Sequence, residues 1–289
     1  MAYAFRRVRP TPTRRFLNNP HRGICTFNCF NGDPLTLLGQ ARPAVPHTEM
    51  PAYPFVAEGY LPSSVAHFRW CWAELEPEEG QFDFSPVEQT LEQCVKRGQS
   101  LCVRLMPYGD SLGTRLPAWY ARRYAVIPTE SRTHKTEIIH EPDFNSKDYL
   151  ERYGGFIREF GRRFGSHPML DAIDMAFSGV WGEGDASCSE EQCAHFAKLY
   201  REAFPGAMLL SQPEPAHLRT ALGVGAGWRA DSFGDMRVSG SAVVSKDASW
   251  NHMYDVYPRD LAAAGATEAW KKAPVFLEVS SDLLRSRVN

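Results

Sequence analysis

Two glutamates, Glu183 and Glu278, each follow a short apolar run of the kind that forms a buried β-strand. The run at 171–177 leads through a glycine-rich turn into Glu183, and the run at 274–278 ends in Glu278 itself. Because the two residues lie far apart in the sequence, only the fold can bring them together. In a barrel of alternating strands and helices, the C-terminal strand ends meet at one mouth, where catalytic groups gather. Two carboxylates at such a mouth are the pair that cleavage of a glycosidic bond most often uses.

Apolar runs bounded by turn residues predict the strands that would carry these groups. They lie at 23–28, 65–71, 100–106, 171–177, 207–211, 230–235 and 274–278. Helical spacing of apolar residues between these runs predicts helices that are capped by Ser85, Ser146 and Ser189, and a short helix at 258–265. Two stretches lack such periodicity and are expected to be long loops: the proline-rich residues 31–62, and the residues between Met106 and Ser146.

Strands that alternate with helices predict a parallel sheet, and about seven repeats favour an α/β fold of the (β/α)8 TIM-type barrel over an open doubly wound sheet. No glycine-rich phosphate-binding motif follows a strand, so the pattern does not support a nucleotide fold. Few residues follow Glu278, so the barrel is expected to lack its last β/α unit in this chain. We therefore expect a natural protein that extends further, or a gap that is covered by residues 31–62 or by a partner chain.

The predicted domains are an irregular basic arm at 1–20 and a barrel catalytic domain at 21–289 that is truncated at its C-terminus. The formal net charge of −2 and the pI near 6.5 give no reason to expect nucleic acid or an anionic membrane as a partner. The arginines of the arm have no interleaved aromatic residues, which indicates a solvated segment. No apolar stretch reaches the roughly 20 residues of a membrane helix, and no secretory signal opens the chain. A cytoplasmic protein is expected, or a secreted one if a signal peptide was removed.

Seven cysteines form no framework of pairs, which favours a reducing compartment. Cys188 and Cys193 are close in sequence, as are Cys25 and Cys29, but neither pair has a second Cys or His pair at metal-ligand spacing. The histidines also show no such spacing. The sequence therefore predicts buried or partly exposed thiols, and neither a metal nor an organic cofactor.

The segment from Phe68 to Phe84 contains Arg69-x-x-Trp72 and then Glu-Pro-x-x-Gly-x-Phe-Asp. It resembles the second strand and following loop of clan A glycoside hydrolases, especially the β-galactosidase-like barrels. The segment 116–120 is similar to the Pro-x-Trp element of those enzymes. The segments 19–23, 179–183 and 270–278 resemble an uncharacterised barrel family that is related to that clan, with an Asn-Pro-x-Arg-Gly start. The resemblance covers the chain from about residue 18 onward.

In that clan the acid/base Glu ends the fourth strand and the nucleophilic Glu ends the seventh. Counted from the run at 23–28, these positions fall on Glu183 and Glu278. The resemblance implies retention of anomeric configuration, with the two carboxyl groups roughly 5–5.5 Å apart. It also implies that Arg69 hydrogen-bonds the nucleophile. Glu183 would need a raised pKa, for which Trp181 is a candidate apolar neighbour.

One position departs from the clan, which has Asn before the acid/base Glu where this chain has Gly182. That asparagine binds the sugar 2-hydroxyl, so Asn145 and Asp143 are candidates to replace it. The residues with a predicted role in substrate binding are Arg69, Arg104, Tyr108, Trp119, Asn145, Trp181 and Asp235. Each has an ordinary structural alternative: the aromatic residues can be core packing, and the arginines can pair with acids inside the barrel.

The leading hypothesis is a retaining hydrolase of β-glycosides, with a carbohydrate substrate and possible assembly into a homo-oligomer. A non-catalytic carbohydrate-binding barrel, or an inactive fragment of a glycosidase, remains as the alternative because of Gly182 and the short C-terminal end. A metal-dependent barrel hydrolase is less well supported, because no His-x-His or carboxylate cluster follows a strand.

Overall fold

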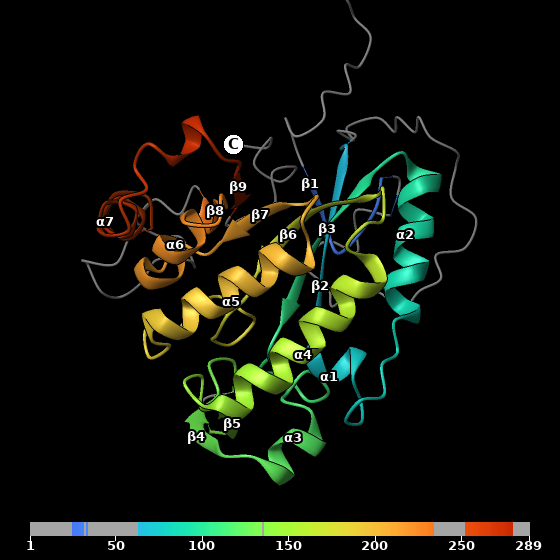
Figure 1. The fold of residues 1–289 in the computed structure, drawn as a ribbon, viewed down its shortest axis with the longest axis vertical. Coiled ribbons are helices and arrows are strands. Elements are labelled where there is room, and N and C mark those ends of the chain that lie inside the picture. The colour runs from blue at the N-terminus through green and yellow to red at the C-terminus, as the bar shows by residue number, and fades with distance from the viewer. Residues whose placement is uncertain (1–24, 32, 34–62, 135, 234–251, 280–289) are drawn as a thin grey trace, which may run out of the picture.

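The computed structural model describes residues 25–31, 33, 63–134, 136–233 and 252–279. Within these ranges a sheet of parallel strands forms the centre of the molecule (Figure 1). Its members are β1 (Cys25–Phe27), β2 (Val65–Cys71), β3 (Ser100–Met106), β6 (Leu170–Met175), β7 (Met208–Ser211), β8 (Gly227–Phe233) and β9 (Val275–Val279). The predicted arm at 1–20 and loop at 31–62 lie largely or wholly outside the described residues.

The strands of this sheet are neighbours in the order β1-β2-β3-β6-β7-β8-β9, which is their order along the chain. A doubly wound sheet reverses its strand order at a switch point, whereas a barrel adds each new strand to the same edge. The topology is therefore that of a TIM-type barrel, as the sequence predicts. β6 is the fourth strand and β9 the seventh, which confirms the count on which the two glutamates were placed.

The register of the sheet aligns charged residues from three adjacent strands. Arg69 of β2 is paired with Arg104 of β3, and Arg104 is paired with Asp174 of β6. β8 carries an irregularity between Ala230 and Phe233 where it pairs with β9. Such a bulge often re-aims a side chain beside a functional site, and Asp231 lies within it.

The helices follow the strands in the expected alternation. They are α1 (Trp72–Leu75), α2 (Ser85–Arg97), α3 (Ala118–Arg123), α4 (Lys147–Phe164), α5 (Glu190–Ala203), α6 (Pro215–Leu222) and α7 (Tyr257–Ala263), with a π-helix at His252–Val256 and a 3-10 turn at Ala269–Lys271. α4 and α5 lie side by side across one face of the sheet (Figure 1). None of the described helices is both long and apolar enough to cross a membrane.

Two of the predicted helix caps are confirmed. The hydroxyl of Ser146 accepts a hydrogen bond from Tyr149 N at 3.1 Å, and that of Ser189 accepts one from Gln192 N at 3.3 Å. The cap predicted at Ser85 is wrong, because Ser85 is already the first residue of α2. The N-cap is Phe84, which makes no side-chain cap bond, and Oδ1 of the preceding Asp83 accepts from the backbone N of Ser85 at 3.0 Å.

The long loop predicted between Met106 and Ser146 contains regular structure. It forms α3 and an antiparallel hairpin of β4 (Val126–Glu130) and β5 (Ile138–Pro142), which lie together at one end of the molecule (Figure 1). Ile127 and Ile138 of this hairpin are exposed. None of the residues of β4 is buried, so this strand lacks the alternation of buried and exposed residues that makes a strand visible in a sequence.

Candidate active site

Glu183 and Glu278 come together at the C-terminal ends of the strands. Glu278 lies in β9, and Glu183 lies in the turn that follows β6. One guanidinium group stands between them: Nη1 of Arg69 is 3.7 Å from Oε1 of Glu183, and Nη2 of Arg69 is 3.7 Å from Oε1 of Glu278. Because both oxygens contact the same compact group, they are less than roughly 10 Å apart, which includes the separations used by retaining and inverting glycosidases. Their side chains are 25% and 28% exposed, so solvent reaches both.

The turn that carries Glu183 depends on left-handed backbone conformations. Gly179 has φ 83° and Gly182 has φ 72°, and Trp181 between them has φ 56°, which is uncommon for a residue with a side chain. The turn is held to the segment that follows β3, because Trp181 N donates to the carbonyl of Tyr108 at 2.9 Å. It closes on itself through a bond from Gly184 N to the carbonyl of Ser178 at 3.1 Å. These bonds aim Glu183 away from the strand and toward Arg69.

The same geometry explains why Gly182 stands where the resembling enzymes have asparagine. A Cβ atom at position 182 would lie 2.4 Å from the Cβ of Ala176, which is too short for two carbon atoms that are not bonded. In this backbone the position admits only glycine.

Arg229 of β8 is the closest cationic partner of Glu278. Its Nη2 donates to Oε2 of Glu278, and its Nη1 donates to Oδ1 of Asp231. Arg69 was predicted to hydrogen-bond Glu278, but at 3.7 Å it forms an ion pair beyond hydrogen-bond distance. Arg69 also lies over the ring of Phe27, 4.2 Å from its centroid, which fixes its position on the opposite side.

Arg104 is fully buried and lies beneath Glu183. Its Nε donates to Oδ2 of Asp174 at 2.8 Å, and its Nη1 donates to the carbonyl of Trp181 at 3.2 Å. Its Nη2 donates to Oδ1 of Asp231 at 3.4 Å, and its Nη1 is 4.0 Å from Oε1 of Glu183. Arg104 therefore pairs with acids inside the barrel, which is the structural alternative that the sequence indicated for it. Its predicted contact with substrate stays a prediction.

Asp174 is the centre of the buried part of this network. Its Oδ2 lies 2.8 Å from Nε of Arg104, 3.2 Å from Nε of Arg229 and 3.3 Å from Nε2 of His67. A carboxylate without exposure needs such partners, because an unpaired buried charge is costly. Asp174 thus holds the two arginines that in turn contact Glu183, Asp231 and Glu278.

Burial and then the nearby charge of Asp231 raise the pKa of Glu183 from 4.5 to about 7, against the opposing effect of Arg104, Arg69 and Arg132. A glutamate with this pKa keeps a proton near neutral pH. That is the requirement for a general acid in glycoside cleavage. The raised pKa was expected from the sequence, with Trp181 as its suggested cause. Trp181 is half-buried and packs against the core beside the turn.

Comparison with known proteins shows the family to which the chain belongs. The family model described as beta-galactosidase, a glycoside hydrolase family, matches residues 56–205, which is more than half of the chain. The chain belongs to this glycoside hydrolase family. The match includes Arg69, Arg104 and Glu183, whereas Arg229, Asp231 and Glu278 lie beyond it.

A beta-galactosidase LacZ from Heyndrickxia coagulans is 29% identical over 112 residues, which cover 34% of this chain and 14% of that protein. The matched segment is therefore a small part of that relative's length. Among solved structures, the catalytic domain of a beta-amylase from Paenibacillus polymyxa superimposes with a TM-score of 0.54 at 8% identity, covering 76% of this chain and 79% of that one. A beta-galactosidase from Halorubrum lacusprofundi gives a TM-score of 0.44 at 16% identity, covering 59% and 36%. The first of these structures supports the barrel fold.

The other residues predicted to bind substrate occupy different places. Trp119 is buried and packs edge-on against Trp72, and its Nε1 donates to the carbonyl of Glu76 at 3.0 Å, so the packing alternative is present. Tyr108 is buried just after β3 and donates to Oε2 of Glu141 at 2.9 Å. Asp235 lies outside the described residues.

Asn145 has a structural role at the start of α4. Its Nδ2 donates to the carbonyl of Ser187 at 2.7 Å, and its Oδ1 accepts from Ser189 N at 2.7 Å. Oδ1 of Asp143 accepts from the backbone of Asn145. Both ends of the Asn145 amide thus tie α4 to the loop after Glu183. Replacement of the missing asparagine by Asn145 or Asp143 stays a prediction.

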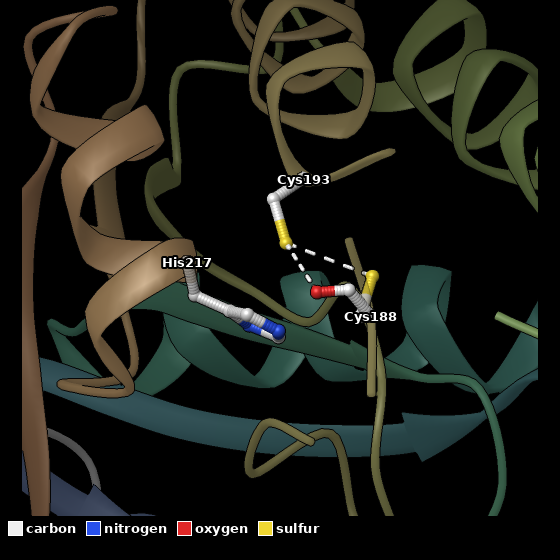
Figure 2. A group of neighbouring side chains, drawn as sticks. All are labelled: Cys188, Cys193 and His217. Carbon is white, nitrogen blue, oxygen red and sulfur yellow. Dashed lines mark hydrogen bonds between the residues drawn. The ribbon is translucent and has the colours of Figure 1, made fainter. Parts of the chain in front are cut away.

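A second cluster, which sequence spacing did not reveal, lies behind the Glu183 turn. Cys188, Cys193 and His217 point toward one another from the loop, α5 and α6 (Figure 2). Their donor atoms lie within 4.8 Å of one another, and two thiols with an imidazole suit a thiophilic metal such as zinc. The thiol of Cys193 donates to the sulfur of Cys188 at 3.6 Å, which lowers the pKa of Cys188 to about 6. Nε2 of His217 is 3.0 Å from the hydroxyl of Ser178, so the cluster also supports the turn.

Proposed function

We propose that this chain hydrolyses a β-glycoside with retention of anomeric configuration, and that a β-galactoside is the substrate class to test first. The observation that carries the proposal is the single guanidinium of Arg69 between Glu183 and Glu278 at the mouth of the sheet. Membership of the glycoside hydrolase family supports a glycosidase in general. The choice of galactoside rests on the description of that family and of the relative.

In the proposed first step, Glu278 attacks the anomeric carbon while Glu183 gives its proton to the departing glycosidic oxygen. Arg229 and Arg69 keep Glu278 charged, because two guanidinium groups contact its carboxylate. In the second step, Glu183 takes a proton from water, which attacks the glycosyl–Glu278 ester and releases the sugar. A proton thus leaves Glu183 in the first step and returns in the second, which suits a carboxyl with a pKa of about 7.

Three measurements test this mechanism. Wild-type protein is expected to release phenol from an aryl β-galactoside, and Glu278→Gln is expected to reduce kcat by about 10³-fold or more, since it removes the nucleophile. Glu183→Ala with added azide is expected to yield the β-glycosyl azide, because a small anion can complete the second step without a general base. Proton NMR of the first-formed sugar then reports retention or inversion.

Glu191→Gln is the matched control, because Glu191 is exposed in the first turn of α5, away from Arg69. It should retain wild-type kcat. An inverted product, or a Glu278→Gln variant as active as Glu191→Gln, would contradict the double-displacement mechanism.

Gly182 favours one second candidate, a barrel that binds carbohydrate without cleaving it. The turn has no asparagine to hold the sugar 2-hydroxyl, and its backbone leaves no space for one. Calorimetric binding of galactosides by wild-type protein, with no product after prolonged incubation, would favour this candidate.

A further inference from the structure

Asp231 is connected to both glutamates of the proposed mechanism. Its Oδ1 accepts from Nη2 of Arg104 at 3.4 Å and from Nη1 of Arg229. Arg104 is also within 4.0 Å of Glu183, and Arg229 also donates to Glu278. Each glutamate is therefore one arginine away from the same third carboxylate.

The oxygens of Asp231 are occupied within the protein. When the amide of Gln212 is oriented to match its neighbours, its nitrogen donates to Oδ2 of Asp231 at 3.0 Å, and its oxygen accepts from Nη1 of Arg229 at 2.9 Å. Gln212 is buried, so this contact is shielded from solvent. Asp231 is thus held in position by Gln212 and the two arginines, while its side chain is 24% exposed.

The carboxyl groups that are directly ion-paired in this network outnumber its arginines by one, which favours a proton on one carboxyl, and Arg132 from the hairpin loop adds a further positive charge that acts on Glu183. The described residues contribute three arginines (Arg69, Arg104, Arg229) and four carboxyl groups (Asp174, Glu183, Asp231, Glu278). His67 does not restore the balance, because burial lowers its pKa and favours the neutral ring. Asp174 has close cationic partners and Glu278 receives the bond from Arg229, whereas the arginines contact Glu183 at 3.7 and 4.0 Å. Glu183 is therefore the carboxyl most easily left neutral.

We propose that Asp231 is a positioning residue of the reaction: its fixed charge keeps the proton on Glu183, while it orients Arg229 on Glu278. This inference rests on the proposed function. The charged groups that act on Glu183 include Arg69 from β2, Arg104 from β3, Asp231 from β8 and Arg132 from the hairpin loop. Glu278 of β9 shares the guanidinium of Arg69 with Glu183. Asp231 carries no proposed covalent role, and removal of its charge acts in one direction, toward an ionised Glu183.

Asp231→Asn tests the proposal, because it removes the charge and keeps the shape. The readout is the pH dependence of kcat/KM, whose basic limb reports the loss of the Glu183 proton. With phenyl β-galactoside, whose leaving group must be protonated by Glu183, this basic limb is expected to move toward acid pH by about one unit. At pH values above the limb, kcat/KM should therefore fall about tenfold. The substrate 2,4-dinitrophenyl β-galactoside has a leaving group that needs no proton, and its kcat/KM should change little. Asp148→Asn, on the exposed first turn of α4, is the matched control.

Gln212→Glu is the second variant and predicts a shift of opposite sign. It adds a negative charge beside Asp231 and two arginines, so the basic limb should move toward alkaline pH. An unmoved limb in both variants, or an equal loss with both substrates at every pH, would overturn the proposal. A wild type that cleaves neither substrate would overturn the proposed function itself. Infrared titration of the carboxyl band that Glu183→Gln abolishes then decides whether Asp231 still controls the Glu183 proton.

Discussion

Nε of Arg104 lies 2.8 Å from Oδ2 of Asp174, and neither side chain is exposed to solvent. The pair joins β3 to β6 below the proposed catalytic mouth. The stability of the fold therefore depends on both charges, because removal of one partner leaves the other as an unpaired buried charge without water to solvate it.

Asp174→Asn is therefore expected to reduce the free energy of unfolding by about 3–5 kcal/mol, since it leaves Arg104 and Arg229 without their shared anion. Urea unfolding followed by circular dichroism measures this loss. The control is Glu190→Gln, which breaks an exposed ion pair with Arg219 and should cost less than about 1 kcal/mol. Equal losses in the two variants would show that the buried network is not needed for stability.

The pKa of Glu183 predicts how stability changes with pH. The folded protein holds this proton up to about pH 7, whereas the unfolded chain loses it near the ordinary value of 4.5. Between these values the folded state binds more protons, so the contribution of Glu183 to the free energy of unfolding declines as pH rises and is constant above about 7. Glu183→Gln should remove this decline and be more stable than wild type in alkaline buffer.

Urea titrations in buffers on either side of this window measure the effect. Glu191→Gln should keep the wild-type decline, because Glu191 is an exposed surface carboxylate. A Glu183→Gln protein with an unchanged pH slope would refute the assignment of the raised pKa.

Gly182→Ala is expected to cost about 1–3 kcal/mol of stability and to reduce activity sharply, because the new methyl group displaces the turn that carries Glu183. Two effects add there: φ is 72°, and the added Cβ would meet Ala176 at 2.4 Å. Gly113→Ala separates the backbone effect from the steric effect, because φ at Gly113 is 91° but no atom lies within 4 Å of the added Cβ. It should cost only about 1 kcal/mol and leave kcat unchanged. Thermal unfolding and kcat of the two variants give the comparison.

The thiols should react slowly in the native protein. Cys25 is the exposed cysteine, but burial of its sulfur environment and the charge of Asp171 raise its pKa to about 11. Cys188 has the low pKa of about 6, yet it is buried beside Cys193. A disulfide reagent at neutral pH should therefore modify few of the seven cysteines until denaturant is added. Rapid modification of Cys188 in the native protein, identified by peptide mapping, would contradict its burial.

The fold, and the position of the two glutamates at strand ends, could be predicted from the sequence because the strands of the sheet are continuous apolar runs. Glu183 and Glu278 stand where such runs stop, and a parallel sheet collects its C-terminal ends at one edge. The hairpin of β4 and β5 was missed for the opposite reason, since Ile127 and Ile138 are both exposed. α6 was missed although Pro215 opens its first turn and Glu214 caps it, which are ordinary start signals.

The roles of Arg229 and Asp174 could not be read from the sequence, because pairing between strands depends on register. A weaker signal was nevertheless present. Arg104, Asp174 and Arg229 each interrupt an apolar strand, and a charge in such a position must find an opposite charge within the fold. The sequence could thus predict that buried pairs exist, but only the topology decides which residues form them.

The closeness of position 182 to the side chain of Ala176 also restricts which substitutions this chain can accept at position 182. Asparagine tolerates the left-handed backbone of Gly182, so the obstacle to Gly182→Asn is the methyl group of Ala176. Ala176→Gly would remove that obstacle and is the change that must come first. The two substitutions are therefore epistatic: the same asparagine is harmful in one background and admissible in the other.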